Sequence, residues 1–309
     1  MKGQILFLVA AFAAISACAR RPAVAQPRFW YGQLRIEGGR EVDKCSDLQV
    51  RAGGELARSA ETFTVSKSQA PTLELHAISH TVMHVRGWER PDYSVEVCKF
   101  AVAGSRSAAD QALRAISIIR NGARFSVTGP DSGDRWQAAV FVHAPKDAAL
   151  NLESGNAPVD AAGVSGKLKV RATNGPLALD RCSGTIDAET VNGPISMNGG
   201  SGEVRLRAMN GPIALKLADA AWNGALLEAR TDNGPLSVTL PSGFRSGLRL
   251  ETSGHGPISC RADVCRNART EGGRYFPSVL QAGSGDVVRL STHNGPVSVS
   301  NTGRRARTI

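Results

Sequence analysis

The chain has 309 residues and a formal net charge of +10 at pH 7; 42% of its residues are hydrophobic, but only 5% are aromatic. It contains 33 glycines and 15 prolines, and aliphatic side chains between so many turn formers favour short strands with tight corners and exclude a helical bundle. The positive charge comes without a nucleic-acid recognition motif, so it indicates a solvated surface or contact with anionic envelope surfaces, and no nucleic-acid partner.

Residues 1–17 are typical of an export signal. Lys2 precedes a short apolar run, which is too short for a transmembrane helix because a span needs about 20 residues. Two cleavage patterns compete. Ile15-Ser16-Ala17-Cys18 resembles a bacterial lipobox, which predicts a lipid on Cys18, whereas Ala23-Val24-Ala25 suits ordinary signal peptidase. We favour lipidation of Cys18.

A lipidated Cys18 would tether the mature chain to a membrane surface through residues 18–28. Later runs are too short and too polar to cross a bilayer, so we expect an exported protein of the cell envelope, in the periplasm or at the outer membrane. Ala19 follows the cysteine in place of Asp, which favours the outer membrane in a host that has two membranes.

The sequence of residues 29–143 predicts an irregular, β-rich N-terminal part. One short helix is expected near 107–113, with Ser107 as its N-cap. Asn121-Gly122 lies between two strand-like runs, and this dipeptide is a strong hairpin signal.

Three histidines in this part invite a metal-site hypothesis. His76, His80 and His84 are four residues apart and would share one face of a helix. The residues around them alternate as strands, however, and a turn is expected at His80. We therefore expect strand and corner histidines, and no metal site.

A repeated tripeptide organises residues 144–303. The spacings between successive copies run 18, 18, 18, 23, 22 and 39 residues, and a period near 20 indicates stacked structural repeats. The copies are Asn174-Gly175-Pro176, Asn192-Gly193-Pro194, Asn210-Gly211-Pro212, Asn233-Gly234-Pro235 and Asn294-Gly295-Pro296, with degenerate copies at Asn156-Ala157-Pro158 and His255-Gly256-Pro257.

The chemistry of the tripeptide predicts a corner. Asn tolerates left-handed backbone geometry, Pro favours an extended residue before it, and Pro can start a strand because no amide donor is needed there. Ser-Gly pairs provide a second corner in three repeats. Two strands and two corners per repeat predict an all-β fold, a parallel β-solenoid with about 18–22 residues per coil.

Alignment on the asparagine separates inward from outward positions. The inward positions form apolar columns with a period of two, as in Leu168, Ile186 and Val204. The outward positions alternate in charge from one repeat to the next. One such column contains Glu153, Arg171, Glu189 and Arg207, and alternation is what an in-register stack with strands about 4.8 Å apart requires.

Disulfides are permitted in an exported chain. Cys260 and Cys265 are expected to close a small loop, Cys45 and Cys98 form the natural second pair, and Cys182 should be free and buried. The spacing of 39 residues before the last Asn-Gly-Pro predicts an inserted loop at 259–284, and a basic tail follows at 304–309. The cysteines lack the CxxC and Cys/His groupings of a metal site.

Val85-Arg86-Gly87-Trp88, residues 140–146 and the run of Asn-Gly-Pro corners resemble the putative-adhesin family, bacterial domains of unknown function. The resemblance covers about residues 70–303 and implies an exported β-solenoid with an envelope location, often as a lipoprotein. It implies no catalytic residues. The disulfide loop and the non-repetitive residues 29–70 depart from the family pattern.

These observations predict a non-enzymatic cell-envelope lipoprotein, an adhesin-like structural or interaction module without a cofactor. Its partners would be the membrane surface, through the lipid anchor, and envelope polymers or other proteins. Motifs such as HExxH, GxSxG and the P-loop are missing from the sequence, and carboxylates paired with arginine stay ionised, which does not suit a general acid. The alternative is a glycan-binding or polysaccharide-cleaving β-helix, favoured if Trp30, Trp88, Trp136 or Trp222 line a groove beside unpaired carboxylates. A subunit that stacks end to end is a third possibility and requires uncapped ends.

Overall fold

The structure is all-β, as predicted. A computed structural model describes residues 28–31, 34–38, 42–77, 80–130, 135–254, 256–272 and 277–302. These residues form 26 strands, one α-helix and two short 3₁₀ turns (η1 and η2), and the strands make sheets of 3, 11 and 12 members. Across these ranges no helix has the length and hydropathy needed to span a membrane.

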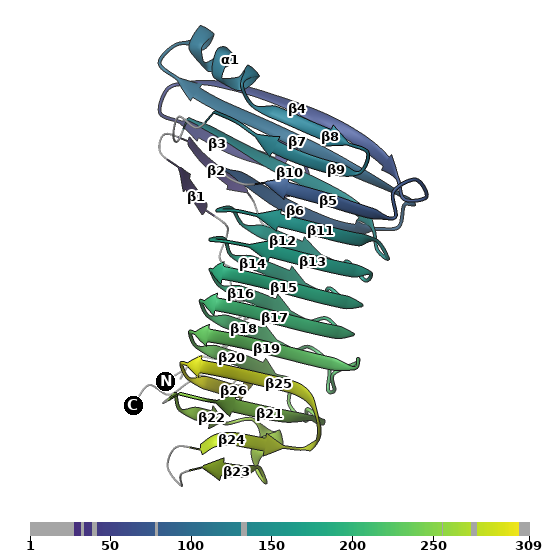
Figure 1. Cartoon of the computed structure of the whole chain (residues 1–309), viewed down its shortest axis with the longest axis vertical. Helices are drawn as coiled ribbons and strands as arrows, with labels where there is room; N and C mark the ends of the chain where they lie inside the picture. Colours follow the sequence, from purple (N-terminus) through teal and green to yellow (C-terminus); the bar gives the residue numbers. More distant parts are fainter. Residues whose placement is uncertain are drawn as a thin grey trace, which may run out of the picture.

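Two large sheets run side by side along the molecule, and each repeat contributes one strand to each (Figure 1). Neighbouring strands from successive repeats are parallel. In the twelve-stranded sheet these are β11 (Ala149–Ser154), β13 (Lys167–Ala172), β15 (Thr185–Asn192), β17 (Glu203–Asn210) and β19 (Leu226–Asn233). In the eleven-stranded sheet they are β12 (Val159–Ala162), β14 (Leu177–Asp180), β16 (Ile195–Asn198), β18 (Ile213–Lys216) and β20 (Leu236–Leu240).

The register of the stack follows the eighteen-residue period. Leu168 pairs with Ile186, and Ile186 pairs with Val204, on adjacent strands of one sheet. All three are at most 1% exposed. The apolar columns therefore form the core between the two sheets, as expected, and burying each such side chain contributes about 1.5–3 kcal/mol relative to leaving it exposed.

The two sheets extend further toward the N-terminus than the expected boundary at residue 144. β5 (Thr72–Ala77) pairs with β11, and β6 (Thr81–Trp88) pairs with β12, so both belong to the parallel stacks. β9 (Arg124–Thr128) and β10 (Trp136–Pro145) come later in the chain but lie on the far side of β5 and β6. This end is completed by β8 (Ser117–Asn121) in one sheet and by β7 (Asp92–Ala103) and β4 (Glu55–Ser66) in the other.

The short helix and the hairpin lie close to where they were expected. Helix α1 spans Arg106–Arg114, and its N-cap is Ser105, whose Oγ accepts a hydrogen bond from the Ala108 amide at 3.4 Å. The prediction of Ser107 as cap was wrong by two residues. Asn121 is the last residue of β8 and pairs with Arg124 of β9, so the turn consists of Gly122, at φ 61°, and Ala123.

A third, antiparallel sheet covers part of the outer side of the eleven-stranded sheet. It consists of β1 (Arg28–Tyr31), β2 (Leu34–Gly38) and β3 (Leu48–Ala52), and Leu34 and Ile36 pack with Phe100 and Phe141. The 3₁₀ turn η1 (Cys45–Asp47) precedes β3 and carries the predicted Cys45–Cys98 disulfide.

The C-terminal end corrects the predicted inserted loop at 259–284. The chain forms β21 (Ser246–Thr252) and β22 (Ile258–Cys260), continues through η2 (Asp263–Cys265), and adds β23 (Arg269–Gly272) and β24 (Pro277–Ala282), which extend the sheet as antiparallel strands. It then returns, and β25 (Ser284–Asn294) and β26 (Val297–Asn301) fit between β19 and β21 and between β20 and β22. The long spacing therefore reflects a return through the stack.

The predicted Cys260–Cys265 disulfide is present, and Cys182 is free and buried. The expected lipidation site Cys18 and the basic tail 304–309 lie outside the described residues.

Candidate interaction surface

The Asn-Gly-Pro asparagines form a ladder of side-chain hydrogen bonds. The Nδ2 of Asn192 donates to Oδ1 of Asn174 at 2.7 Å, and the Nδ2 of Asn210 donates to Oδ1 of Asn192 at 2.9 Å. Amide ladders of this kind stabilise stacked identical strands. The same contact joins the pairs Asn156–Asn174, Asn210–Asn233 and Asn233–Asn294.

The ladder, and not left-handed backbone geometry, explains why asparagine occupies the corner positions. Among the described residues other than glycine, positive φ occurs only at His80 and Arg181. The corner asparagines therefore do not use left-handed geometry, and that expectation was wrong. Their amide groups instead bind their equivalents in the neighbouring repeats.

The outward side chains of the twelve-stranded sheet form a charged face. In the order of the stack, one row is Lys169, Asp187, Arg205, Glu228, Arg289 and Arg249, and the next row is Arg171, Glu189, Arg207, Arg230, Ser291 and Glu251. Glu189 lies between Arg171 and Arg207, as predicted. Its carboxylate is 3.2 Å from Arg171, while Arg207 is 3.8 Å from Asp187.

Glu189→Lys is expected to destabilise the fold by about 1 kcal/mol, because it places three like charges in one row on adjacent strands. Glu189 is 44% exposed, so salt should reduce the loss. Glu189→Gln is the matched control and should cost less. Thermal melting in low and high salt measures both variants, and a Lys variant that melts like the wild type in low salt would contradict the ion-pair interpretation.

The outer face of the eleven-stranded sheet is different. One of its rows consists of small side chains, Ala178, Ser196, Ala214, Ser237 and Ser298. These residues carry no charge and only weak recognition chemistry. The charged face is therefore the better candidate for an interaction surface.

The alternation of charge breaks at the C-terminal end of the charged face. Arg207 pairs in register with Arg230, and Arg289 pairs with Arg249. Ser291 occupies the place between Arg230 and Glu251, where every neighbouring position in the row carries a long side chain. The short serine leaves a depression.

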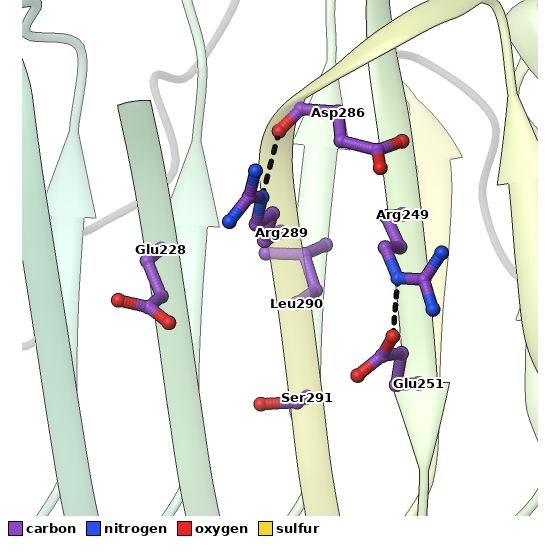
Figure 2. A pocket seen from close by; sticks show the side chains of 7 residues that line it. All are labelled: Glu228, Arg249, Glu251, Asp286, Arg289, Leu290 and Ser291. Carbon is purple, nitrogen blue, oxygen red and sulfur yellow. Dashed lines mark hydrogen bonds and ion pairs between the residues drawn. The ribbon is translucent and has the colours of Figure 1, made fainter. Parts of the chain in front are cut away.

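Figure 2 shows this depression, a hollow of about 360 Å³ over β19, β25 and β21. A second hollow of about 390 Å³ adjoins it. Both are lined by Glu251 and Ser291, so we treat them as one depression and call it the trough. The first hollow also contains Glu228, Arg249, Asp286, Arg289 and Leu290, and the second also contains Arg230, Thr252, Ser253, Ser278, Val279, Thr292 and His293.

The charged groups of the trough differ in how they are held. Arg249 is hydrogen-bonded to Glu251, and this carboxylate raises the pKa of Arg249. Glu228 lies 3.7 Å from Arg205. Arg289 donates through Nε to the backbone oxygen of Asp286 at 3.0 Å, and it makes none of the ion pairs found among the described residues.

A second polar cluster joins the third sheet to the stack. Nδ1 of His84 lies 2.5 Å from Asp160, Arg86 donates to the other Asp160 oxygen at 2.9 Å, and Arg86 also lies 3.5 Å from Asp43. The His84 ring stacks on Phe141. Burial alone would raise the pKa of Asp160, but the hydrogen bonds and charges of His84 and Arg86 outweigh it and lower the pKa.

This cluster is structural in character. A lowered pKa in the folded state means that Asp160 contributes stability above its unfolded-state pKa, near 3.9, and loses it as the pH falls further. Because Arg86 spans Asp160 of β12 and Asp43 near the third sheet, the cluster holds that sheet against the stack. His76 lies on β5 and His84 on β6, so these two histidines belong to different sheets.

The three tryptophans whose side chains are described do not line the trough. Trp136 and Trp222 are core residues at 2% and 7% exposure. Trp88 donates to the Asp92 carbonyl and contacts His143 and Arg90. The side chain of Trp30 lies outside the description. The aromatic platform that would have favoured a glycan-binding or polysaccharide-cleaving β-helix is therefore not found for the three tryptophans whose side chains are described.

Sequence reasoning missed the trough. Its residues come from 228–230, 249–253, 278–279 and 286–293, and the return of β25 into the stack brings them together. The one available signal was the serine at position 291, where the aligned repeats carry arginine or glutamate.

No protein-family model matches the chain, and no curated protein matches its sequence. A putative cell adhesion protein from Clostridium sporogenes is 11% identical, and the match covers 80% of this chain and 100% of that one at a TM-score of 0.30. A putative adhesin from Bacteroides fragilis is 8% identical over 79% and 97% of the two chains, with a TM-score of 0.35. A putative lipid binding protein from Parabacteroides distasonis is 9% identical over 82% and 96%, with a TM-score of 0.24. With TM-scores this low the likenesses carry no functional argument, which therefore rests on the residues of this chain.

Proposed function

We propose that this chain is a non-enzymatic lipoprotein of the cell envelope, in which a β-solenoid presents the charged face as an adhesin-like interaction surface. The two sheets would be the two walls of the solenoid, and each repeat of two strands and two corners would be one coil. The pairing of successive repeats supports this fold: every strand of the repeat lies parallel to its equivalent on both sides.

The proposal that the protein is not an enzyme depends on one observation: carboxylates of the charged face are bound by arginine. Asp187 lies 2.6 Å from Arg171, Glu203 lies 2.6 Å from Arg205, and Glu251 is bound by Arg249. A general acid needs a carboxyl group that stays protonated, and a nearby guanidinium favours the ionised form. The charges of the face are therefore better suited to holding register and binding a partner than to proton transfer.

The competing function, polysaccharide cleavage, has a direct assay. We expect the purified chain to release no reducing ends from a panel of neutral and acidic polysaccharides. Release that is lost in Glu251→Gln or Glu228→Gln, with unchanged melting temperature, would contradict the proposal and identify an enzyme.

Anchoring is tested by Cys18→Ser. The wild-type chain should partition into the detergent phase of Triton X-114 and carry a lipid on Cys18 by mass spectrometry, because acyl chains add about 0.8 kcal/mol of membrane affinity for each buried CH₂. The Cys18→Ser chain should stay in the aqueous phase or remain an uncleaved precursor.

Cys182→Ala is the matched control, since it removes a buried thiol that lies outside the lipobox sequence and should leave partitioning unchanged. A mature chain that begins at Gln26 without modification would show secretion without an anchor.

A further inference from the structure

We propose that the trough binds a carboxylate-bearing saccharide unit of an acidic envelope polysaccharide, with Arg289 binding the carboxylate. This inference depends on the proposed function, because it names the ligand class of the interaction surface.

The trough is the part of the charged face where a row of long side chains is interrupted. In the row that holds Ser291, the preceding strands carry Glu189, Arg207 and Arg230, and β21 carries Glu251. Only the position on β25 is short. Ser291 therefore forms a floor, with Arg230 on one side, Glu251 on the other, and Arg289 and His293 along the same strand.

Arg289 is the arginine of the lining that makes no ion pair with a carboxylate among the described residues. Arg249 is bound by Glu251, Arg230 lies 3.5 Å from Asp232, and Glu228 is close to Arg205. Asp286 is a further carboxylate of the lining, and it accepts a hydrogen bond from Gln281 at 3.5 Å. The guanidinium of Arg289 has a like-charged neighbour in register, Arg249, and it donates a hydrogen bond to the backbone oxygen of Asp286. A carboxylate on Arg289 would offset this repulsion, and the planar fork of a guanidinium matches a carboxylate with two parallel hydrogen bonds.

The remaining lining favours a saccharide over a simple anion. The hydroxyl of Ser253 lies 2.7 Å from Nδ1 of His293, and Ser278 and Ser291 add further hydroxyl groups. The lining therefore offers hydroxyl and imidazole groups as donors and acceptors beside the arginines, which suits vicinal sugar hydroxyls beside a carboxylate. A free phosphate would need donors alone. Leu290 and Val279 are the apolar residues of the lining, too few for the buried aromatic or aliphatic anchor that a protein partner usually supplies.

The test is calorimetric titration of the full chain in detergent with an oligogalacturonate, against the methyl-esterified oligomer as a matched probe of the same sugar without charge. We expect the acid to bind and the ester not to bind. Arg289→Gln should weaken binding about tenfold or more, as expected for loss of a charge-assisted pair. Ser291→Glu should abolish binding, because it fills the trough and adds a negative charge.

Lys169→Gln is the matched control for charge. Lys169 lies in the same row as Arg289, is exposed, and is remote from the trough, so its loss should change the affinity less than about twofold if binding is local rather than electrostatic steering. Each variant should melt like the wild type. If Arg289→Gln does not, Arg289→Lys takes its place, because lysine keeps the charge but lacks the planar fork of the guanidinium.

Several outcomes would overturn the inference. Equal losses in Lys169→Gln and Arg289→Gln, or equally tight binding of dextran sulfate, would mean diffuse charge attraction. Inorganic phosphate competing at the same affinity would mean a simple anion site. If the acid does not bind, acidic saccharides are rejected as the ligand class. The proposal of a lipid-anchored envelope protein would still be tested separately by the partitioning of the Cys18→Ser chain.

Discussion

Gly211→Ala is expected to destabilise the fold by about 3 kcal/mol or more, at the upper end of what a single overpacking substitution does. A Cβ built on Gly211 would lie 2.1 Å from the carbonyl oxygen of Gly193 and 2.7 Å from its carbonyl carbon. These atoms are backbone of the adjacent repeat, so relief requires the repeats to separate. Chemical denaturation, followed by circular dichroism, measures the loss in unfolding free energy.

Gly104→Ala is the control for this prediction. Apart from its own residue and its two chain neighbours, no atom of the described residues lies within 4 Å of a Cβ at this position, and its backbone is not left-handed. Alanine there should be neutral or slightly stabilising, because it restricts the unfolded chain. Equal stability losses at Gly104 and Gly211 would show that close backbone packing is not what demands glycine at the corners.

Removing the Cys45–Cys98 disulfide by a double alanine substitution is expected to cost up to about 4 kcal/mol, since the bond closes a loop with a sequence separation of 53. The bond also connects η1 to β7, and so holds the third sheet near the stack. Unfolding of oxidised wild-type and double-variant chains under identical conditions measures the difference.

The second disulfide supplies the comparison. Cys260 and Cys265 are separated by only five residues, so the same chain-entropy argument gives about 2 kcal/mol for their removal. Reduced wild-type protein should resemble the chain that lacks both bonds. A larger loss for the short loop than for the long one would contradict the entropic explanation.

The repeat region was predictable because its constraints are local. Leu168, Ile186 and Val204 recur with one spacing, and that spacing alone places them on adjacent strands. The two disulfides followed from proximity in sequence and from elimination. The physical role of the corner asparagine was missed because a ladder contact exists only once the repeats are stacked.

The ends of the stack were not predictable in the same way. β25 continues the period of β19 but is separated from it in the chain by five strands, β20 to β24, and it also pairs with one of them, β21. Nothing in a spacing of 39 residues distinguishes a loop from a return through the sheet. For the same reason the trough could not be assembled from the sequence, because Arg289 and Arg249 become neighbours only through that return.

The position of β25 and β26 also bears on the order of folding. They are synthesised after β21 to β24, yet they lie inside the stack, with β19 and β20 on one side and β21 and β22 on the other (Figure 1). A chain that folded progressively during synthesis would place β21 on β19, and this pairing would have to be undone. Contacts of such long sequence separation form slowly. A chain that folds only after β25 and β26 are available avoids this misfolded arrangement.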